Sequence, residues 1–126
     1  MREISTNDAP KSAGHYSQAI VHNNVVYISG QLPIDPKTGE KRLGSIEEQT
    51  EQALKNLDGI LKAAGSNLNQ VIKTTVYLSD IELWGRMNVV YSGFFGEHRP
   101  ARSVVPTKNL HHGFQIEIEA VAALNQ

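Results

Sequence analysis

The side chains best suited to bind or transform a small molecule lie near the end of the chain. Arg102 follows Pro100 and opens an expected strand. A planar guanidinium at the edge of an element can hold a carboxylate or a phosphate through two parallel hydrogen bonds. Most arginines instead form surface ion pairs, and Arg99 is a second cation close enough in sequence to compete for the binding role. The residue pattern alone leaves both roles of Arg102 open.

Glu117 and Glu119 lie on one side of the last expected strand. A carboxylate at a buried interface can hold a water molecule or act as a general acid or base, because burial tunes its pKa. The alternative for Glu117 is a solvated face or an ion pair across an interface. The spacing of about 7 Å between the two residues is also compatible with glycoside hydrolysis or metal binding. No further carboxylate lies near in sequence, which argues against that last interpretation.

Ser29 and Gly30 interrupt a strongly apolar strand. A glycine inside a strand marks a β-bulge or a place where another group approaches the backbone closely. The sequence therefore predicts a bulge, and it leaves open whether the bare amide also meets a ligand oxygen.

The adjacent His111 and His112 do not have the helical spacing of a metal-binding pair, so we expect a polar loop there. The chain contains no cysteine, which excludes disulfides, thiolate zinc sites, iron–sulfur clusters and cysteine nucleophiles. No nucleophile-elbow, phosphate-loop or dinucleotide-binding motif is present in the sequence either.

The composition is that of one ordinary globular domain spanning residues 1–126, with 40% hydrophobic and 20% charged residues. The formal net charge of −1 gives no basic surplus for binding a phosphate backbone, so a nucleic-acid partner is not expected. The polar start lacks the apolar core of a secretory signal, and no apolar run is long enough to cross a membrane. We therefore expect a soluble cytoplasmic protein.

The helices and strands that must position these residues are predicted from the spacing of apolar residues and from the glycines and prolines that separate the segments. The expected strands cover residues 16–21, 25–34, 71–79, 103–108 and 114–124. The expected helices cover residues 46–64 and 81–95. Ser45 and Glu48 form a capping box for the first helix, Gly65 ends it, and Asp80 can cap the second. The order β-β-α-β-α-β-β predicts an α+β sandwich with two helices on one face of a mixed sheet.

The last strand alternates between an apolar face and a mixed face. The apolar face is expected under the helices, and Glu117 and Glu119 lie on the other face. That second face also carries apolar residues, because the run from Val25 to Ile28 has no polar side. A half-apolar face without helices usually has a partner, so we expect a homo-oligomer that buries it.

Several segments, taken in order along the chain, carry a family signature. They are Ala9-Pro10 with GHYSQA at 14–19, SGQLP at 29–33, VIKTTVYL at 71–78 with Asn88, Tyr91, Phe94 and Phe95, and PARS at 100–103 with Leu110 and IEIEA at 116–120. Together they resemble the RidA family of reactive-intermediate (enamine/imine) deaminases, also called YjgF-like proteins. The resemblance extends over nearly the whole chain.

The resemblance implies a chorismate-mutase-like fold that forms a homotrimer with active sites between subunits. It implies hydrolysis of reactive 2-imino or 2-enamino acids, such as 2-aminoacrylate or 2-iminobutanoate, to 2-keto acids and ammonia. The implied enzyme is a 2-iminobutanoate/2-iminopropanoate deaminase that removes damaging metabolites and needs no metal or other cofactor.

The resemblance also implies roles for individual residues. Arg102 would hold the substrate carboxylate, and Glu117 would orient and activate the attacking water. The amide of Gly30 and the main chain around Val104 would contact the substrate carboxylate and imine nitrogen. Three further residues would line the pocket: Tyr16, Ser29 and Asn88.

Some residues depart from the family pattern, which leaves the preferred substrate open. Val104 stands where many members have a cysteine, and the segment 109–113 (NLHHG) replaces a common Leu-Pro-Lys-Asp loop. The loop before Arg102 (97–100) is shorter than in some members. Two alternatives to the deaminase stay open: a non-catalytic trimeric binder of small carboxylates with a regulatory role, and an RNA-cleaving translation inhibitor, against which the neutral charge argues.

Overall fold

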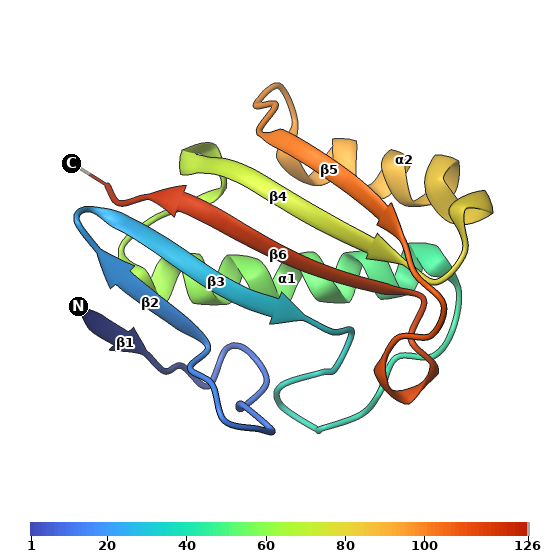
Figure 1. Ribbon diagram of the computed structural model, residues 1–126, viewed down its shortest axis with the longest axis horizontal. Helices are drawn as coiled ribbons and strands as arrows, with labels where there is room; N and C mark the ends of the chain where they lie inside the picture. The colour runs from blue at the N-terminus through green and yellow to red at the C-terminus, as the bar shows by residue number, and fades with distance from the viewer. Residues whose placement is uncertain (126) are drawn as a thin grey trace.

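The computed structural model describes residues 1–125, which form a single six-stranded mixed sheet with two helices behind it (Figure 1). The strands are β1 (Arg2–Ile4), β2 (Ala19–His22), β3 (Val25–Gln31), β4 (Val71–Leu78), β5 (Ala101–Pro106) and β6 (Ile116–Ala123). The helices are α1 (Ile46–Ala64) and α2 (Trp84–Phe95), with short 3-10 turns η1 (Leu68–Gln70), η2 (Ile81–Leu83) and η3 (His111–Gly113). The predicted α+β class with both helices on one face is confirmed.

The sheet order is β1-β2-β3-β6-β4-β5, so the last strand of the chain lies in the middle of the sheet. β6 pairs antiparallel with both β3 and β4, whereas β5 pairs parallel with β4 and forms one edge. The two-residue turn between β2 and β3 places Asn23 and Asn24 at positive φ, as hairpin turns that match strand twist require.

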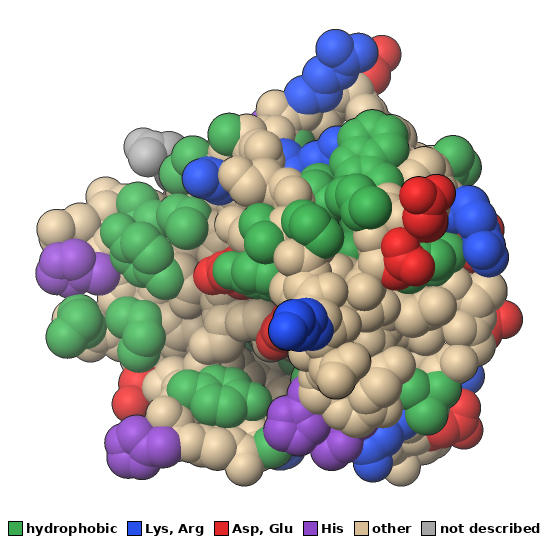
Figure 2. Space-filling model, turned by 45° about the vertical axis from the view of Figure 1, so that its right-hand side comes forward, with side chains coloured by type: hydrophobic (Ala, Val, Ile, Leu, Met, Phe, Trp, Pro, Cys, Tyr) green, Lys and Arg blue, Asp and Glu red, His purple; other side chains and the backbone are tan. Residues whose placement is uncertain are grey.

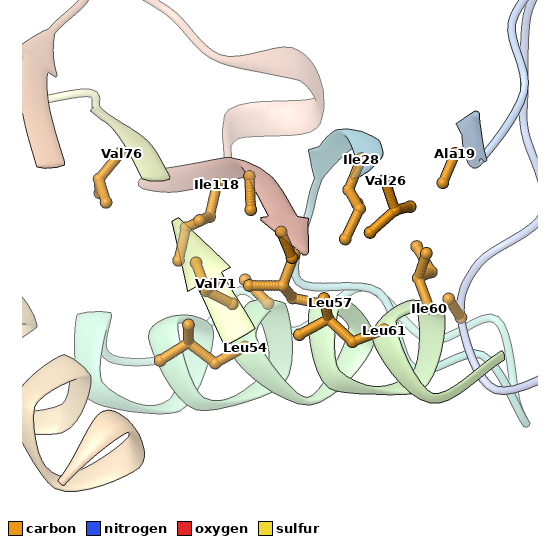
Figure 3. Close-up of a cluster of buried hydrophobic side chains, with 14 of the residues drawn as sticks. Ala19, Val26, Ile28, Leu54, Leu57, Ile60, Leu61, Val71, Val76 and Ile118 are labelled. Carbon is orange, nitrogen blue, oxygen red and sulfur yellow. The ribbon is translucent and has the colours of Figure 1, made fainter. Parts of the chain in front are cut away.

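Helix α1 begins and ends where the sequence predicts. The Ser45 side chain accepts a hydrogen bond from the Glu48 amide at 3.2 Å, and Gly65 adopts the left-handed conformation with φ 83°. The predicted apolar stripe of α1 is buried against the sheet (Figure 3). The labelled side chains of α1 in that view, Leu54, Leu57, Ile60 and Leu61, face Val26, Ile28, Val71, Val76 and Ile118 of the strands.

Burial of one face of β6 fixes the direction of its other side chains. Ile116, Ile118, Ala120 and Ala122 are buried, and the residues that alternate with them are partly exposed on the opposite face. A shift of one residue in pairing would exchange the two faces. Glu117 and Glu119 therefore point to the helix-free side, as the alternation predicts.

Several predicted boundaries are wrong, each for a local reason. The first expected strand begins at Ala19 rather than at residue 16, because the preceding residues form a loop. The next strand ends at Gln31, after a register shift. The last strand begins at Ile116, because η3 occupies residues 111–113. β5 lies two residues earlier than expected.

Two further features differ from the prediction. Asp80 caps the 3-10 turn η2, because its side chain accepts from the Glu82 amide at 2.9 Å, and α2 begins only at Trp84. Strand β1 was not predicted. Its three residues include the charged Arg2 and Glu3, and only Ile4 is buried, so the segment carries no strand pattern.

The helix-free face of the sheet carries apolar side chains that nothing in residues 1–125 covers. Figure 2 shows hydrophobic side chains gathered there beside a hollow. Tyr27 and Val105 are 50% and 37% exposed, respectively, and lie on this face. None of the helices within residues 1–125 combines the length and apolar character needed to span a membrane.

The segment before β2 packs closely against α1. An ideal Cβ at Gly59 of α1 would lie 2.5 Å from the Asp8 carbonyl oxygen. Backbone at that distance must move to admit a side chain. The glycine therefore permits the close approach that holds residues 8–18 in place, and this segment forms one wall of the hollow described below.

The close contact between Gly59 and Asp8 predicts that two glycine-to-alanine substitutions in helices have opposite effects on the free energy of unfolding. Alanine is favoured over glycine in a helix by about 1 kcal/mol, yet we expect Gly59→Ala to lower the free energy of unfolding because it displaces Asp8. Gly93→Ala in α2 is the matched control, since no described atom lies within 4 Å of its ideal Cβ, and we expect it to raise that free energy. Urea titration followed by circular dichroism at one protein concentration measures both changes. Stabilisation by Gly59→Ala would contradict the packing argument.

Candidate functional site

A bulge in β3 places the backbone of Gly30 against the carboxylate of Glu117. The pairing of β3 with β6 shifts register between Ile28 and Gln31, which confirms the predicted bulge. An ideal Cβ at residue 30 would lie 2.8 Å from the Glu117 carboxyl carbon. A side chain at residue 30 would displace the carboxylate from this position, so the bare Gly30 backbone and the Glu117 carboxylate form one surface.

The environment of Glu117 raises the pKa of its carboxyl group. Burial is the largest cause, the negative charge of Glu119 adds to it, and the nearby His111 opposes it. A raised pKa makes the carboxylate a better proton acceptor than an ordinary glutamate, because basicity increases with pKa. Glu117 is therefore suited to accept a proton from water and return it.

The neighbouring Glu119 is held by a tyrosine of the adjacent strand. The Tyr77 hydroxyl donates a short hydrogen bond to Glu119 Oε1. This bond is the main reason why the pKa of Tyr77 is raised. Tyr77 also lies directly opposite Glu117 in the pairing of β4 with β6. Glu119 thus adds a negative charge beside Glu117, and one of its two carboxylate oxygens is occupied by the bond from Tyr77.

Tyr16 and Ser29 belong to the same end of the sheet but differ in role. Tyr16 is 52% exposed and lines a hollow together with Gly30, His111 and His112. The Ser29 hydroxyl donates to the Ser17 carbonyl at 2.6 Å. Ser29 therefore holds the segment that carries Tyr16, and its donor is already used within the protein.

A second group of residues holds Arg102. Its Nη1 donates to Asn88 Oδ1 at 2.8 Å, and its guanidinium lies over the Tyr91 ring at 4.7 Å and the Trp84 ring at 5.5 Å from the ring centres. The Tyr91 hydroxyl bonds Thr74 at 2.7 Å in the core. Burial raises the pKa of Tyr91, so its ring stays neutral beneath the cation. Helix α2 thereby orients the guanidinium.

The Arg102 guanidinium has no protein carboxylate within 4.0 Å among the described residues, whereas Arg42 and Arg86 are both paired with acidic side chains. Arg99 and Arg102 both line a second hollow, which lies beside α2 and is separate from the one beside Gly30. The Arg99 side chain is exposed. Val104 lies two residues further along β5, with its side chain packed partly against the core. Because β5 is an edge strand, every second amide near Val104 faces away from β4 and is open to a ligand.

The two groups do not meet within one chain. Arg102 pairs with Thr74 of β4, whereas Glu117 pairs with Tyr77 of β4 from its other side. The guanidinium contacts α2 on the helix side of the sheet, and the carboxylate lies on the helix-free side. The structure thus brings Gly30 and Glu117 together, and separately Asn88 and Arg102.

Sequence reasoning missed several residues of these groups. Tyr77 and Tyr91 belong to the segments that carry the family signature, and Trp84 lies in the second expected helix. The sequence did not predict their roles, because these depend on strand register and on the placement of α2. His111 and His112 were expected in a polar loop. They lie in the turn η3 and line the hollow beside Gly30.

Comparison with known proteins assigns the family. The chain matches the family model described as Endoribonuclease L-PSP over residues 6–124. A RutC family protein of Pyrococcus horikoshii is 53% identical over 94% of this chain and 94% of that protein. The human 2-iminobutanoate/2-iminopropanoate deaminase is 46% identical over 96% of this chain and 88% of that protein. The structure of E. coli TdcF with bound serine gives a TM-score of 0.94 at 35% identity, over 99% of this chain and 100% of that one. The chain therefore belongs to the endoribonuclease L-PSP family, which includes the RidA and YjgF proteins.

Proposed function

We propose that this protein hydrolyses reactive 2-imino or 2-enamino acids, such as 2-aminoacrylate and 2-iminobutanoate, to 2-keto acids and ammonia. The observation that carries the proposal is that the chain holds both an oriented guanidinium without a carboxylate partner among the described residues and a partly buried carboxylate whose pKa is raised. The first suits the carboxylate that every such substrate carries, and the second suits activation of water. The deaminase name of the human relative and the serine bound by TdcF support the same substrate class.

In this reaction Glu117 takes a proton from a water molecule while the water oxygen bonds to the carbon of the protonated imine. The product of this step is a neutral tetrahedral carbinolamine. The protonated Glu117 then gives its proton to the amine nitrogen. Glu117 next accepts the hydroxyl proton as the carbon–nitrogen bond breaks, the 2-keto acid and ammonia leave, and the proton on Glu117 passes to ammonia, which becomes ammonium. The Gly30 amide and the free amides near Val104 orient the substrate. Imines already hydrolyse in water, so positioning supplies much of the required acceleration.

The working site forms between subunits of a homotrimer in this proposal. Arg102 and Glu117 lie on opposite faces of one sheet, so the arginine and the glutamate of a single chain would belong to two different sites. The exposed apolar face around Tyr27 and Val105 and the open edge of β5 are surfaces that a second copy can cover. A neighbouring subunit then brings its arginine to the glutamate.

Removing the cation should weaken substrate use. We expect Arg102→Ala to lower kcat/KM by roughly 10- to 100-fold, because a charge-assisted hydrogen-bonded pair contributes about 1.5–3 kcal/mol. Arg102→Lys should recover only part of this loss, since an ammonium group makes no bidentate contact. The assay couples the protein to a serine or threonine dehydratase and follows keto-acid release. Full activity of Arg102→Ala would exclude the anchor role. A loss in Arg99→Ala as large as that in Arg102→Ala would show that Arg99 competes for this role.

The pH dependence of kcat/KM should follow the ionisation of the Glu117 carboxyl group. The carboxylate is the active form, so the rate rises as pH increases through the pKa of Glu117, above the ordinary value of 4.5. Glu119→Gln removes a negative charge that raises this pKa, so the acid limb should move to lower pH. Glutamine keeps an acceptor for Tyr77. An acid limb that stays in place would show that another group titrates.

Mixing two inactive variants tests whether the site is shared. Glu117→Gln alone should lose roughly 100-fold or more of the rate, in the range of general base removal. When Glu117→Gln and Arg102→Ala subunits are dissociated and reassembled at equal amounts, about one quarter of the sites in a cyclic trimer receive both intact residues. We expect about that fraction of wild-type activity. Activity no higher than the sum of the two variants would place both residues in one chain's site, and keto-acid binding without turnover in the wild type would indicate a binder.

A further inference from the structure

The hollow beside Gly30 ends at two adjacent histidines to which the proposed reaction gives no role. His111 and His112 lie in η3 and line this hollow together with Tyr16. Their imidazole rings are 4.0 Å apart between centres. His112 adopts a left-handed conformation with φ 58°, which histidine tolerates better than most residues other than glycine. The backbone of the turn thus sets the place from which the His112 side chain leaves the chain.

The turn η3 (His111–Gly113), the histidine turn, lies directly before the strand that carries Glu117. Phe114 follows the turn, is fully buried, and meets the His112 ring edge-on at 6.0 Å between centres. The Phe114 amide donates to the His111 carbonyl at 3.2 Å. Glu117 lies three residues further on, and His111 is close enough to affect its carboxylate. A substrate whose imine carbon lies at Glu117 can therefore place its side chain against these rings.

The charge around this end of the hollow is positive. Lys11 also lines the hollow, and no acidic side chain is among its lining residues. Burial lowers the pKa of His112, and the nearby His111 and Lys41 lower it further. The positive charge of Lys11 and Lys41 would stabilise an anion placed beside His112.

We propose that the hollow formed by Tyr16, His111 and His112 selects substrates that carry a second carboxylate, namely 2-imino dicarboxylic acids of four or five carbons. This inference rests on the proposed deaminase function and names its substrate class. The α-carboxylate goes to Arg102, the imine carbon lies between Gly30 and Glu117, and the side-chain carboxylate accepts hydrogen bonds from the two imidazoles. Lys11 adds an attractive charge at the edge of the hollow.

The apolar walls of the hollow favour a different substrate. Pro10, Ala13, Leu32 and Ile34 line its sides, and a long uncharged side chain would bury more of them. The two kinds of substrate differ in a measurable preference, because the histidine turn, with Lys11 at the edge of the hollow, distinguishes a carboxylate from a methyl group of similar size.

The test compares a dicarboxylic imine with monocarboxylic imines. L-glutamate oxidase forms 2-iminoglutarate, and L-amino-acid oxidase forms 2-iminobutanoate or the imine of leucine, with catalase present. Competition with semicarbazide measures imine hydrolysis. We expect kcat/KM for 2-iminoglutarate to exceed that for 2-iminobutanoate by roughly tenfold, as a charge-assisted contact provides. The double variant His111→Gln/His112→Asn should remove this preference, mainly through KM for 2-iminoglutarate, and asparagine tolerates the left-handed backbone.

Controls separate this inference from the proposed function. His22→Asn, at the exposed hairpin, should leave both rates unchanged. Calorimetry of 2-oxoglutarate against 2-oxobutanoate measures the same preference without turnover, and tighter binding of 2-oxoglutarate that the double variant loses would support the inference even if no imine were hydrolysed. Turnover of 2-iminobutanoate with no preference in rate or binding would overturn the inference and leave the deaminase function intact. A preference that survives in the double variant, or a leucine imine used better than 2-iminoglutarate, would also overturn it.

Discussion

The burial of one face of β6 beneath α1 is the constraint on which the other features depend. Because β6 is hydrogen-bonded on both sides, its register constrains the registers of β3 and β4. The pairing of β6 therefore decides which side chains of all three strands face the helices. The apolar residues at 116, 118, 120 and 122 all lie in the core. Any slip by one residue would bury two glutamates without partners, at a large cost in desolvation. The positions of Glu117, of the Gly30 bulge that fits it and of Tyr77 opposite it all follow from this one register.

The same constraint divides the chemistry between two faces. Side chains on the helix side find aromatic neighbours in α2, and Arg102 is held there over Tyr91 and Trp84. Side chains on the helix-free side have only the sheet and the loops around them, so Glu117 gains its raised pKa from burial and from Glu119. An oriented guanidinium and a carboxylate with a raised pKa are thus held separately, each by its own neighbours. The proposed site between copies of the chain would use both.

The loops at the end of the sheet are held by contacts of their own. The segment before β2 is held against α1 by the absence of a side chain at Gly59, and the histidine turn is held by Phe114. These two contacts place Tyr16 and His111 around the hollow beside Gly30. Neither contact involves the residues of the proposed reaction. Substrate selection can therefore change through the loops while the strands that carry the reaction remain as they are.

Local sequence determined those features that depend on neighbours along the chain. Both ends of α1 were predicted because Ser45 and Gly65 act within one turn, and the facing of β6 was predicted because strand side chains alternate. The candidate residues Arg102 and Glu117 were identified by residue type and by family resemblance. Only the tertiary structure decided that β6 lies between β3 and β4, that Tyr77 bonds Glu119, and that η3 reaches the hollow. These are contacts between segments distant in sequence, and no local pattern encodes which strands pair or what a loop meets. The short charged β1 was missed for the same reason, since it becomes a strand only through pairing with β2.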